Sequence, residues 1–205
     1  METQLDLFPA FAFAADVRPK LVAFSGRAGS GKSVAAQALI NVGFVRVKFA
    51  SPLKNMLRAY YKTVGLDTEQ IERRVEGDLK EAPDEALQGR SPRHAMVTLG
   101  TEWGRDLMAQ DFWVAAWRTA VMSQFSKGRN VVVDDCRFAN EVDAVHELGG
   151  VVVAITQWKI PDPSAQGEPH RSEKFDFTPD KVISNCSTID SLRDNALRVI
   201  GRNTQ

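Results

Sequence analysis

Short apolar runs alternate with segments of helical pattern along most of the chain. The runs are rich in valine and are bounded by glycine, proline and polar residues, which is typical of buried strands. We expect five strands, at residues 20–24, 44–50, 130–135, 151–156 and 181–185. Helical segments lie between and after them, at residues 34–40, 53–61, 68–80, 92–107, 111–125, 140–148 and 187–200. Strands that are separated by helices predict a parallel sheet with helices on both faces.

Three of the predicted helices begin with a capping signal. Ser51 and Ser91 each precede a proline, the pairing expected of an N-cap residue followed by the first helical turn. Asp111 stands before a segment that is apolar on nearly all sides, and we expect it to cap a helix whose tryptophans pack in the core.

A glycine-rich loop connects the first predicted strand to the first predicted helix. Its spacing, G-x-x-x-x-G-K-S, lets backbone N–H groups surround phosphate oxygens, and the helix N-terminus adds positive potential. We expect Lys32 to neutralise the β- and γ-phosphates and the Ser33 hydroxyl to bind Mg²⁺. The predicted nucleoside triphosphate site comprises Gly26, Arg27, Ala28, Gly29, Ser30, Gly31, Lys32 and Ser33. Such a loop identifies the ligand and leaves the reaction open.

Two aspartates follow the valines of the third predicted strand. Ligands of parallel α/β sheets bind at the carboxyl ends of the strands, so Asp134 and Asp135 are expected near the phosphate loop, where an acidic residue commonly lies close to Mg²⁺. One of the two can instead cap the next turn. We favour Asp135 as the functional residue because it begins the segment Asp135-Cys136-Arg137, which presents an acid and a base together.

Arginines accumulate in the loops that the pattern places at the same edge of the sheet. They are Arg90, Arg93, Arg105, Arg137 and Arg171. An arginine fork can hold two phosphate oxygens at once, so this set is suited to a phosphoryl donor together with a phosphorylated acceptor. A phosphate acceptor needs no general base, because its oxygen is already an anionic nucleophile.

Composition excludes several classes of protein. The 205 residues predict one domain, and 26 Lys and Arg against 26 Asp and Glu argue against a nucleic-acid coat or a polybasic membrane binder. No apolar run approaches the roughly 20 residues of a membrane span. Cys136 and Cys186 lack metal-like spacing, and we expect two buried small side chains in a protein of the reducing cytoplasm.

Residues 1–18 stand apart from the predicted domain. Their apolar stretch has no preceding basic residue and no cleavage site, so it does not fit a signal peptide, and we expect a flexible extension. Within it, one pentapeptide resembles the motif by which bacterial replication proteins dock on the sliding clamp. It consists of Gln4, Leu5, Asp6, Leu7 and Phe8. The alternative is an apolar tail that packs on its own domain.

From residue 20 to residue 200 the chain resembles the deoxynucleoside monophosphate kinases of tailed bacteriophages, a family within the P-loop nucleoside monophosphate kinases. The matching segments, in the family's order, are 26–33, 49–54, 91–93, 99–105, 133–141, 170–173 and 183–185. Most diagnostic are Leu-Gly-Thr-Glu at 99–102 and Asp-x-Arg-Phe-x-Asn-Glu at 135–141. The chain departs from many relatives in the segment Ala50-Ser51-Pro52, where an acidic residue is expected before the proline.

The resemblance implies a three-layer α/β/α P-loop kinase fold with a parallel central sheet. One domain would span residues 19–205, with a helical acceptor-binding insertion at about 51–127 and a lid loop at about 157–176. The implied reaction is transfer of the ATP γ-phosphate to a deoxynucleoside 5′-monophosphate, with Mg²⁺, for DNA precursor synthesis. The implied protein is a monomer or homodimer in the cytoplasm of a bacterial host, with no membrane or nucleic-acid partner.

The same resemblance assigns roles by position. The implied catalytic residues are Lys32, Asp135, Arg137 and Arg171, and the implied metal ligands are Ser33 and Asp135. Residues implied on the acceptor side are Arg93, Trp103, Arg105, Asp135, Arg137, Glu141 and His170. Trp103 would lie near the base, and His170 and Arg171 would belong to the lid.

Other classes of protein also use a phosphate loop. A P-loop kinase for another small metabolite, such as dephospho-coenzyme A, would share the fold and differ in its acceptor pocket. A GTP switch is disfavoured because no Asn-Lys-x-Asp segment is present. A non-catalytic nucleotide-binding accessory, docked through its N-terminal peptide, is disfavoured by the intact Lys32, Ser33 and Asp135.

Overall fold

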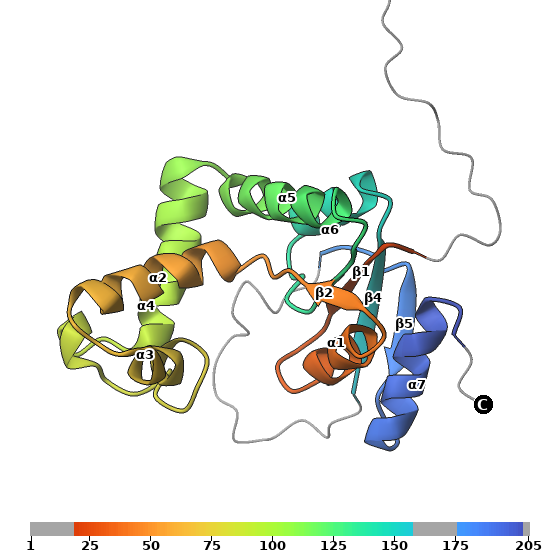
Figure 1. Ribbon diagram of the computed structural model, residues 1–205, viewed down its shortest axis with the longest axis horizontal. Helices are drawn as coiled ribbons and strands as arrows, with labels where there is room; N and C mark the ends of the chain where they lie inside the picture. Colours follow the sequence, from red (N-terminus) through yellow and green to blue (C-terminus); the bar gives the residue numbers. More distant parts are fainter. Residues whose placement is uncertain (1–18, 158–175, 203–205) are drawn as a thin grey trace, which may run out of the picture.

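A parallel sheet lies at the centre of the molecule (Figure 1). The computed structural model describes residues 19–157 and 176–202. The strands are β1 (Leu21–Ser25), β2 (Phe44–Arg46), β3 (Asn130–Val133), β4 (Val151–Thr156) and β5 (Lys181–Ser184), in the order β2-β3-β1-β4-β5. In β1, Ala23 is in register with Val133 on one side and Val152 on the other. The central position of β1 explains why its five residues are all buried, and the predicted parallel sheet is confirmed.

Helices cover both faces of this sheet, as predicted (Figure 1). Helices α1 (Lys32–Ile40) and α7 (Ile189–Val199) cover one face, and α5 (Phe112–Phe125) and α6 (Ala139–Glu147) cover the other. Strand side chains alternate between the faces, so that Phe24 packs against α1 and α7 while Ala23 packs toward α5 and α6. On the second face Trp117 is fully buried and stacks on Phe49, with ring centroids 4.2 Å apart, as the apolar pattern predicts.

A group of helices between β2 and α5 stands beside the sheet (Figure 1). It contains α2 (Ser51–Thr63), α3 (Thr68–Val75), the short helix η1 (Glu85–Leu87), α4 (Pro92–Thr98) and the π-helix η2 (Leu99–Met108). Its own core centres on Tyr61, whose hydroxyl donates a hydrogen bond to the buried Asp84 at 2.8 Å. Arg74 Nε donates to the same Asp84 oxygen at 2.8 Å. The insertion is therefore internally braced and can serve as one wall of a site.

Several element ends differ from the sequence prediction. Strand β2 ends at Arg46 instead of residue 50, because the N–H groups of Phe49 and Ala50 bond to the side chain of Asp135 instead of to a neighbouring strand. Helix α3 ends at Val75 instead of residue 80, because the Gly77 N–H bonds to the Glu72 carbonyl, five residues back, instead of continuing the i→i−4 pattern. The segment predicted as one helix over 92–107 is an α-helix that continues as the π-helix η2.

The capping predictions have different outcomes. Ser91 caps α4 by accepting a hydrogen bond from the His94 N–H, at 3.2 Å. Ser51 is the first helical residue of α2, with Ala50 at the cap position. The Asp111 side chain does not cap α5; its Oδ1 accepts a hydrogen bond from Asn140 Nδ2 at 2.8 Å.

The two cysteines also differ from each other. Cys136 is fully buried, as expected, whereas Cys186 is exposed in the segment after β5, where the expectation of burial was wrong. Within residues 19–157 and 176–202, no helix has both the length and the apolar character that crossing a membrane requires. The expected clamp-docking peptide and the lid residues His170 and Arg171 lie outside the described residues.

Candidate active site

The phosphate loop joins the end of β1 to the start of α1. Gly31 precedes the helix with a φ of 105°, a backbone conformation that favours glycine. A Cβ at Gly31 would lie 2.6 Å from Leu192 Cδ2 and 2.8 Å from Asn185 Nδ2. Asn185, which follows β5, donates a hydrogen bond from Nδ2 to the Ser30 carbonyl at 2.9 Å. Asn185, in the C-terminal part of the chain, therefore stabilises the conformation of the loop, which gives a structural role to this residue of the matching segment 183–185.

Lys32 lies against the loop to which it belongs. Its side chain is almost buried, and Nζ donates hydrogen bonds to the carbonyl oxygens of Gly26 at 2.8 Å and Arg27 at 2.7 Å. The ammonium group is thus positioned at the N-terminus of α1, where the helix dipole also attracts anions. Two sources of positive potential coincide at the loop.

A cavity of about 370 Å³ extends from Lys32 and Ser33 to the helical insertion. Its cationic lining residues are Lys32, Lys48, Lys54, Lys80, Arg93, Arg105 and Arg137. The carboxylates that line it are Glu76, Asp134, Asp135 and Glu141. Among the described residues, seven cations against four carboxylates leave an excess of three positive charges at the cavity, in a chain of zero net charge. The cavity is therefore suited to a strongly anionic ligand.

One part of the cavity wall is apolar. Leu53 from α2, Met96 from α4 and Trp113 from α5 line it, together with Phe49 and Phe138. Aromatic and aliphatic surfaces next to a few charged groups are typical of sites that enclose a flat organic ring and fix its polar substituents. The cavity can accordingly hold a ring system and phosphate groups at the same time.

Seven of the predicted site residues meet in this cavity. Those that line it are Lys32, Ser33, Arg93, Arg105, Asp135, Arg137 and Glu141. Trp103, which was expected near the base, is not among the described lining residues. Its ring contacts Phe112 edge-to-face, with centroids 5.3 Å apart, and Trp113 takes the place at the cavity. The pattern of the sequence had assigned Trp113 to packing alone.

Three lysines of the cavity were not predicted from the sequence. Lys54 is almost buried and forms an ion pair with Glu76, with 2.7 Å between Nζ and Oε2. Burial lowers the pKa of Lys80, and the positive charges of Arg93 and Lys54 lower it further. Lys48 had a signal in the sequence, because apolar and basic residues alternate over 44–50. Lys54 and Lys80 had none, since only the packing of the insertion brings them to the sheet edge.

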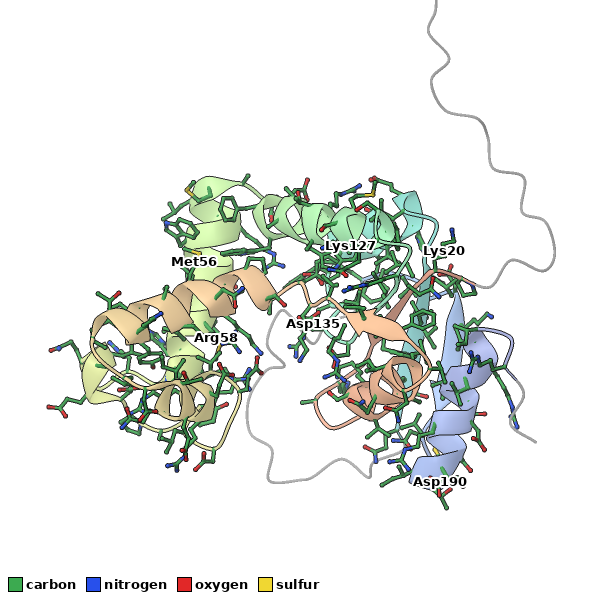
Figure 2. The ribbon with its side chains drawn as sticks, in the orientation of Figure 1. Lys20, Met56, Arg58, Lys127, Asp135 and Asp190 are labelled. Atoms are coloured by element: carbon green, nitrogen blue, oxygen red, sulfur yellow. The ribbon has the colours of Figure 1, made fainter. Side chains whose placement is uncertain are left out.

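The two aspartates after β3 have different surroundings. Asp135 lies between the sheet and the helical insertion (Figure 2), where its two oxygens accept hydrogen bonds from the N–H groups of Phe49 and Ala50, each at 3.0 Å. Burial raises the pKa of Asp135, and the neighbouring Asp134 raises it further, while the two N–H donors oppose these effects. Asp135 therefore holds the turn from β2 into α2.

Asp134 faces the other side of the sheet. Val132 packs against α1 and α7, so strand alternation places Asp134 on that same face, where Arg46 reaches Gln37 of α1. Asp134 is 4% exposed, and neither of its carboxylate oxygens has a hydrogen-bond partner within the part of the chain that the structure describes. The nearest cations are Arg46 Nε at 3.6 Å and Lys48 Nζ at 3.7 Å. A buried carboxylate with such sparse contacts points to a ligand.

These features define the class of protein: a phosphate loop at the edge of a parallel sheet, with a cationic cavity beside it, is the arrangement of a P-loop kinase. Comparison with known proteins specifies the family. The model of the deoxynucleotide monophosphate kinase family matches residues 67–195. A candidate deoxynucleotide monophosphate kinase of Acanthamoeba polyphaga mimivirus is 30% identical over 198 residues, which cover 90% of this chain and 98% of that protein. The chain belongs to the deoxynucleotide monophosphate kinase family and is a nucleotide kinase.

Solved structures show more distant likenesses. A dephospho-CoA kinase from Campylobacter jejuni is 14% identical, with a TM-score of 0.46, over 89% of this chain and 96% of that one. An APS kinase from Mycobacterium tuberculosis is 16% identical, with a TM-score of 0.40, over 91% of this chain and 99% of that one. Likenesses at this level have no bearing on the reaction.

Proposed function

We propose that this kinase transfers the γ-phosphoryl group of ATP to a deoxynucleoside 5′-monophosphate, releasing ADP and the deoxynucleoside diphosphate for DNA synthesis. One observation supports this proposal above the others. A single cavity includes Lys32 and Ser33 of the phosphate loop, an arginine cluster and an apolar wall. A donor phosphate, an acceptor phosphate and an acceptor base would each find a suitable surface in it.

The proposed transfer requires little covalent chemistry from the protein. The bond between the γ-phosphorus and its bridging oxygen to the β-phosphate breaks, and an oxygen of the acceptor phosphate forms the new bond to phosphorus. The attacking oxygen is already anionic, so no side chain has to remove a proton from it. The protein contributes by positioning both nucleotides and by neutralising charge, and Lys32 is placed to do this on the donor side.

Arg93, Arg105 and Arg137 are the proposed acceptor-side cations. A monophosphate ester carries roughly −1.5 to −2 charges at pH 7, and arginine forks hold such a group in a defined orientation. Arg93 comes from the insertion, whereas Arg137 follows β3 at the sheet edge. Cations from both sides of the cavity can therefore hold the acceptor phosphate, while Leu53, Met96 and Trp113 face the base.

Mg²⁺ is the cofactor that the family implies, and the donors at the loop fit it. Among the described residues no group of three or more His, Cys, Asp or Glu side chains could hold a metal. This suits Mg²⁺, which prefers oxygen ligands and is commonly held by one or two protein groups together with substrate phosphates. We propose Ser33 and Asp134 as these groups, since the oxygens of Asp135 are already engaged in the turn. When bound, Mg²⁺ would neutralise phosphate charge.

An ADP-release assay over a panel of acceptors tests the reaction. The panel contains the deoxy- and ribonucleoside monophosphates, with dephospho-coenzyme A and adenylyl sulfate as acceptors of other P-loop kinases. We expect turnover with one or more deoxynucleoside monophosphates, and a fall in kcat of at least a hundredfold in Lys32→Ala, which retains the fold. The absence of turnover with every deoxynucleoside monophosphate, or near-normal turnover in Lys32→Ala, would refute the proposal.

Two matched substitutions test the metal ligand. Asp134→Asn is expected to raise the Mg²⁺ concentration needed for half-maximal activity. Asp135→Asn is expected mainly to lower the unfolding temperature, because an amide accepts only one of the two backbone hydrogen bonds that now hold the turn. The opposite pattern would indicate that Asp135, and not Asp134, binds Mg²⁺.

A further inference from the structure

We propose that Glu141 is a positioning residue, which holds the guanidinium group of Arg105 in the acceptor pocket and does not itself contact the nucleotide. This inference rests on the proposed function, and it replaces the expectation that Glu141 binds substrate. The contacts of the Glu141 carboxylate and the π-helix η2, which carries Arg105, support this role.

Both oxygens of Glu141 are already engaged. Oε1 accepts a hydrogen bond from Arg105 Nη2 at 2.8 Å. Oε2 accepts from the backbone N–H groups of Arg137 at 2.7 Å and Phe138 at 3.2 Å. Glu141 is only 2% exposed. Although Glu141 lines the cavity, a ligand could bind this carboxylate only by displacing the contacts that join it to two acceptor-side arginines.

Arg105 is restrained on three sides. Glu141 holds one nitrogen, while Nη1 donates to the Gly100 carbonyl at 3.1 Å. The guanidinium carbon lies 4.1 Å from the centroid of the Phe138 ring, close enough for a cation–π contact. A long side chain held in this way presents its charge in one orientation, which is the condition for bidentate recognition of a phosphate.

The π-helix η2 makes this arrangement possible. Trp113 Nε1 donates to the same Gly100 carbonyl at 2.9 Å, so the indole anchors the turn from which Arg105 extends. Gly104 permits this contact, because a Cβ at that position would lie 2.2 Å from Trp113 Nε1. π-Helical turns are rare and are often found at functional sites. Here the turn brings Arg105 toward α6 and Glu141.

A buried arginine and a buried glutamate also depend on each other electrostatically. The side chain of Arg105 is 13% exposed and that of Glu141 is 3% exposed, so either charge would be poorly solvated without its partner. Asp135 and Cys136 are the other titratable groups that affect Glu141 or are affected by it. The pair therefore forms a fixed unit, in which Glu141 holds the guanidinium group of Arg105 at the cavity wall.

Steady-state kinetics of Glu141→Gln test this proposal. We expect the KM of the acceptor to rise about tenfold or more while the KM of ATP stays within twofold. The matched control is Glu72→Gln, because Glu72 also pairs with an arginine, Arg58 on the insertion (Figure 2), and neither residue is among the described residues that line the cavity. The control is expected to leave both KM values unchanged. An unchanged acceptor KM in Glu141→Gln would overturn the proposal.

A double-mutant cycle then asks whether Glu141 acts through Arg105. In an Arg105→Ala background, Glu141→Gln should change the acceptor KM less than twofold. An equal effect in both backgrounds would refute a positioning role. Should Glu141→Gln not fold, Glu141→Asp replaces it, since its shorter carboxylate cannot reach both Arg105 and the backbone N–H of Arg137. A normal acceptor KM in that variant would likewise overturn the proposal.

A second readout does not need activity. The ¹⁵N–¹H heteronuclear NOE of Arg105 Nε, assigned with Arg105→Lys, should report an ordered side chain in the wild type. It should fall in Glu141→Gln and remain high in Glu72→Gln. If the wild type phosphorylates no monophosphate, the proposed function fails, and this measurement still decides the positioning role. An ordered Arg105 in Glu141→Gln would refute it.

Discussion

Replacing Gly104 with alanine should destabilise the protein far more than the same change at Gly100. Both glycines are buried in the π-helix η2, and neither has a positive φ. A Cβ at Gly104 would lie 2.2 Å from Trp113 Nε1 and 2.5 Å from Trp113 Cε2. At Gly100 the nearest atom is Leu53 Cδ2 at 3.4 Å, the end of a flexible side chain. The pair of variants isolates close packing from the general effect of alanine in a helix.

The size of the effect follows from the surroundings of Trp113. The indole is 2% exposed and packs on Phe112, with ring centroids 4.8 Å apart, so it has little room to move. Overpacking of a core costs about 1–3 kcal/mol. Loss of the hydrogen bond from Trp113 to the Gly100 carbonyl adds roughly 1–3 kcal/mol if a polar atom stays buried without a partner. The higher helix propensity of alanine offsets about 1 kcal/mol, which leaves a net loss of roughly 1–5 kcal/mol.

Urea denaturation followed by tryptophan fluorescence measures this difference. For a chain of this size, 1 kcal/mol corresponds to about 2–4 °C in Tm, so thermal unfolding should show a loss of roughly 2–20 °C for Gly104→Ala. Gly100→Ala should stay within about 1 kcal/mol of the wild type. Equal stability of the two variants would show that the Gly104–Trp113 contact does not constrain η2. It would also refute the inference that this contact positions Arg105.

Two further predictions concern pH and the N-terminal segment. Burial raises the pKa of Glu141 from 4.5 to about 7, and the charge of Asp135 is the second cause of this increase. Between pH 4.5 and pH 7 the folded protein therefore retains a proton on Glu141 that the unfolded chain releases. The resulting stability is fully present below about pH 4.5 and is lost as pH rises through 7. The unfolding free energy of the wild type minus that of Glu141→Gln should therefore fall by about 3 kcal/mol between pH 4.5 and pH 7. A difference that does not change with pH in urea titrations would contradict this prediction. Deleting residues 1–9, which include Gln4, Leu7 and Phe8, should abolish binding to a bacterial sliding clamp in surface plasmon resonance and leave kinase activity intact. Clamp binding that survives the deletion, or no binding by the full chain, would rule out docking through this segment.

Much of the fold could be predicted because its signals are local. The glycine spacing over 26–33 and the valine runs at 131–133 and 151–153 each depend on neighbours in sequence, and each element formed as expected. The position of the cavity was also predictable, because parallel strands place their carboxyl ends at one edge. For this reason Arg105 and Arg137 could be expected together, although they come from different segments, and the family resemblance added Glu141 to them.

The details of the site depended on contacts between distant segments. The choice between Trp103 and Trp113 follows from the winding of η2 and from the space that Gly104 leaves. Lys54 and Lys80 enter the cavity because of the way the insertion packs beside the sheet. These outcomes depend on side chains that are far apart in the chain, and no spacing rule predicts them.

The sequence by itself determined the phosphate loop, the order of strands and helices and the family, because these depend on local spacing and on motifs that occur in a set order. Tertiary structure alone decided the surroundings of the two adjacent aspartates. The alternation of β3 directs Asp134 toward α1 and leaves Asp135 to bond with the turn after β2. It also decided that Glu141 binds the side chain of Arg105. Burial and hydrogen-bond partners distinguish such residues, and both arise only when the chain has folded.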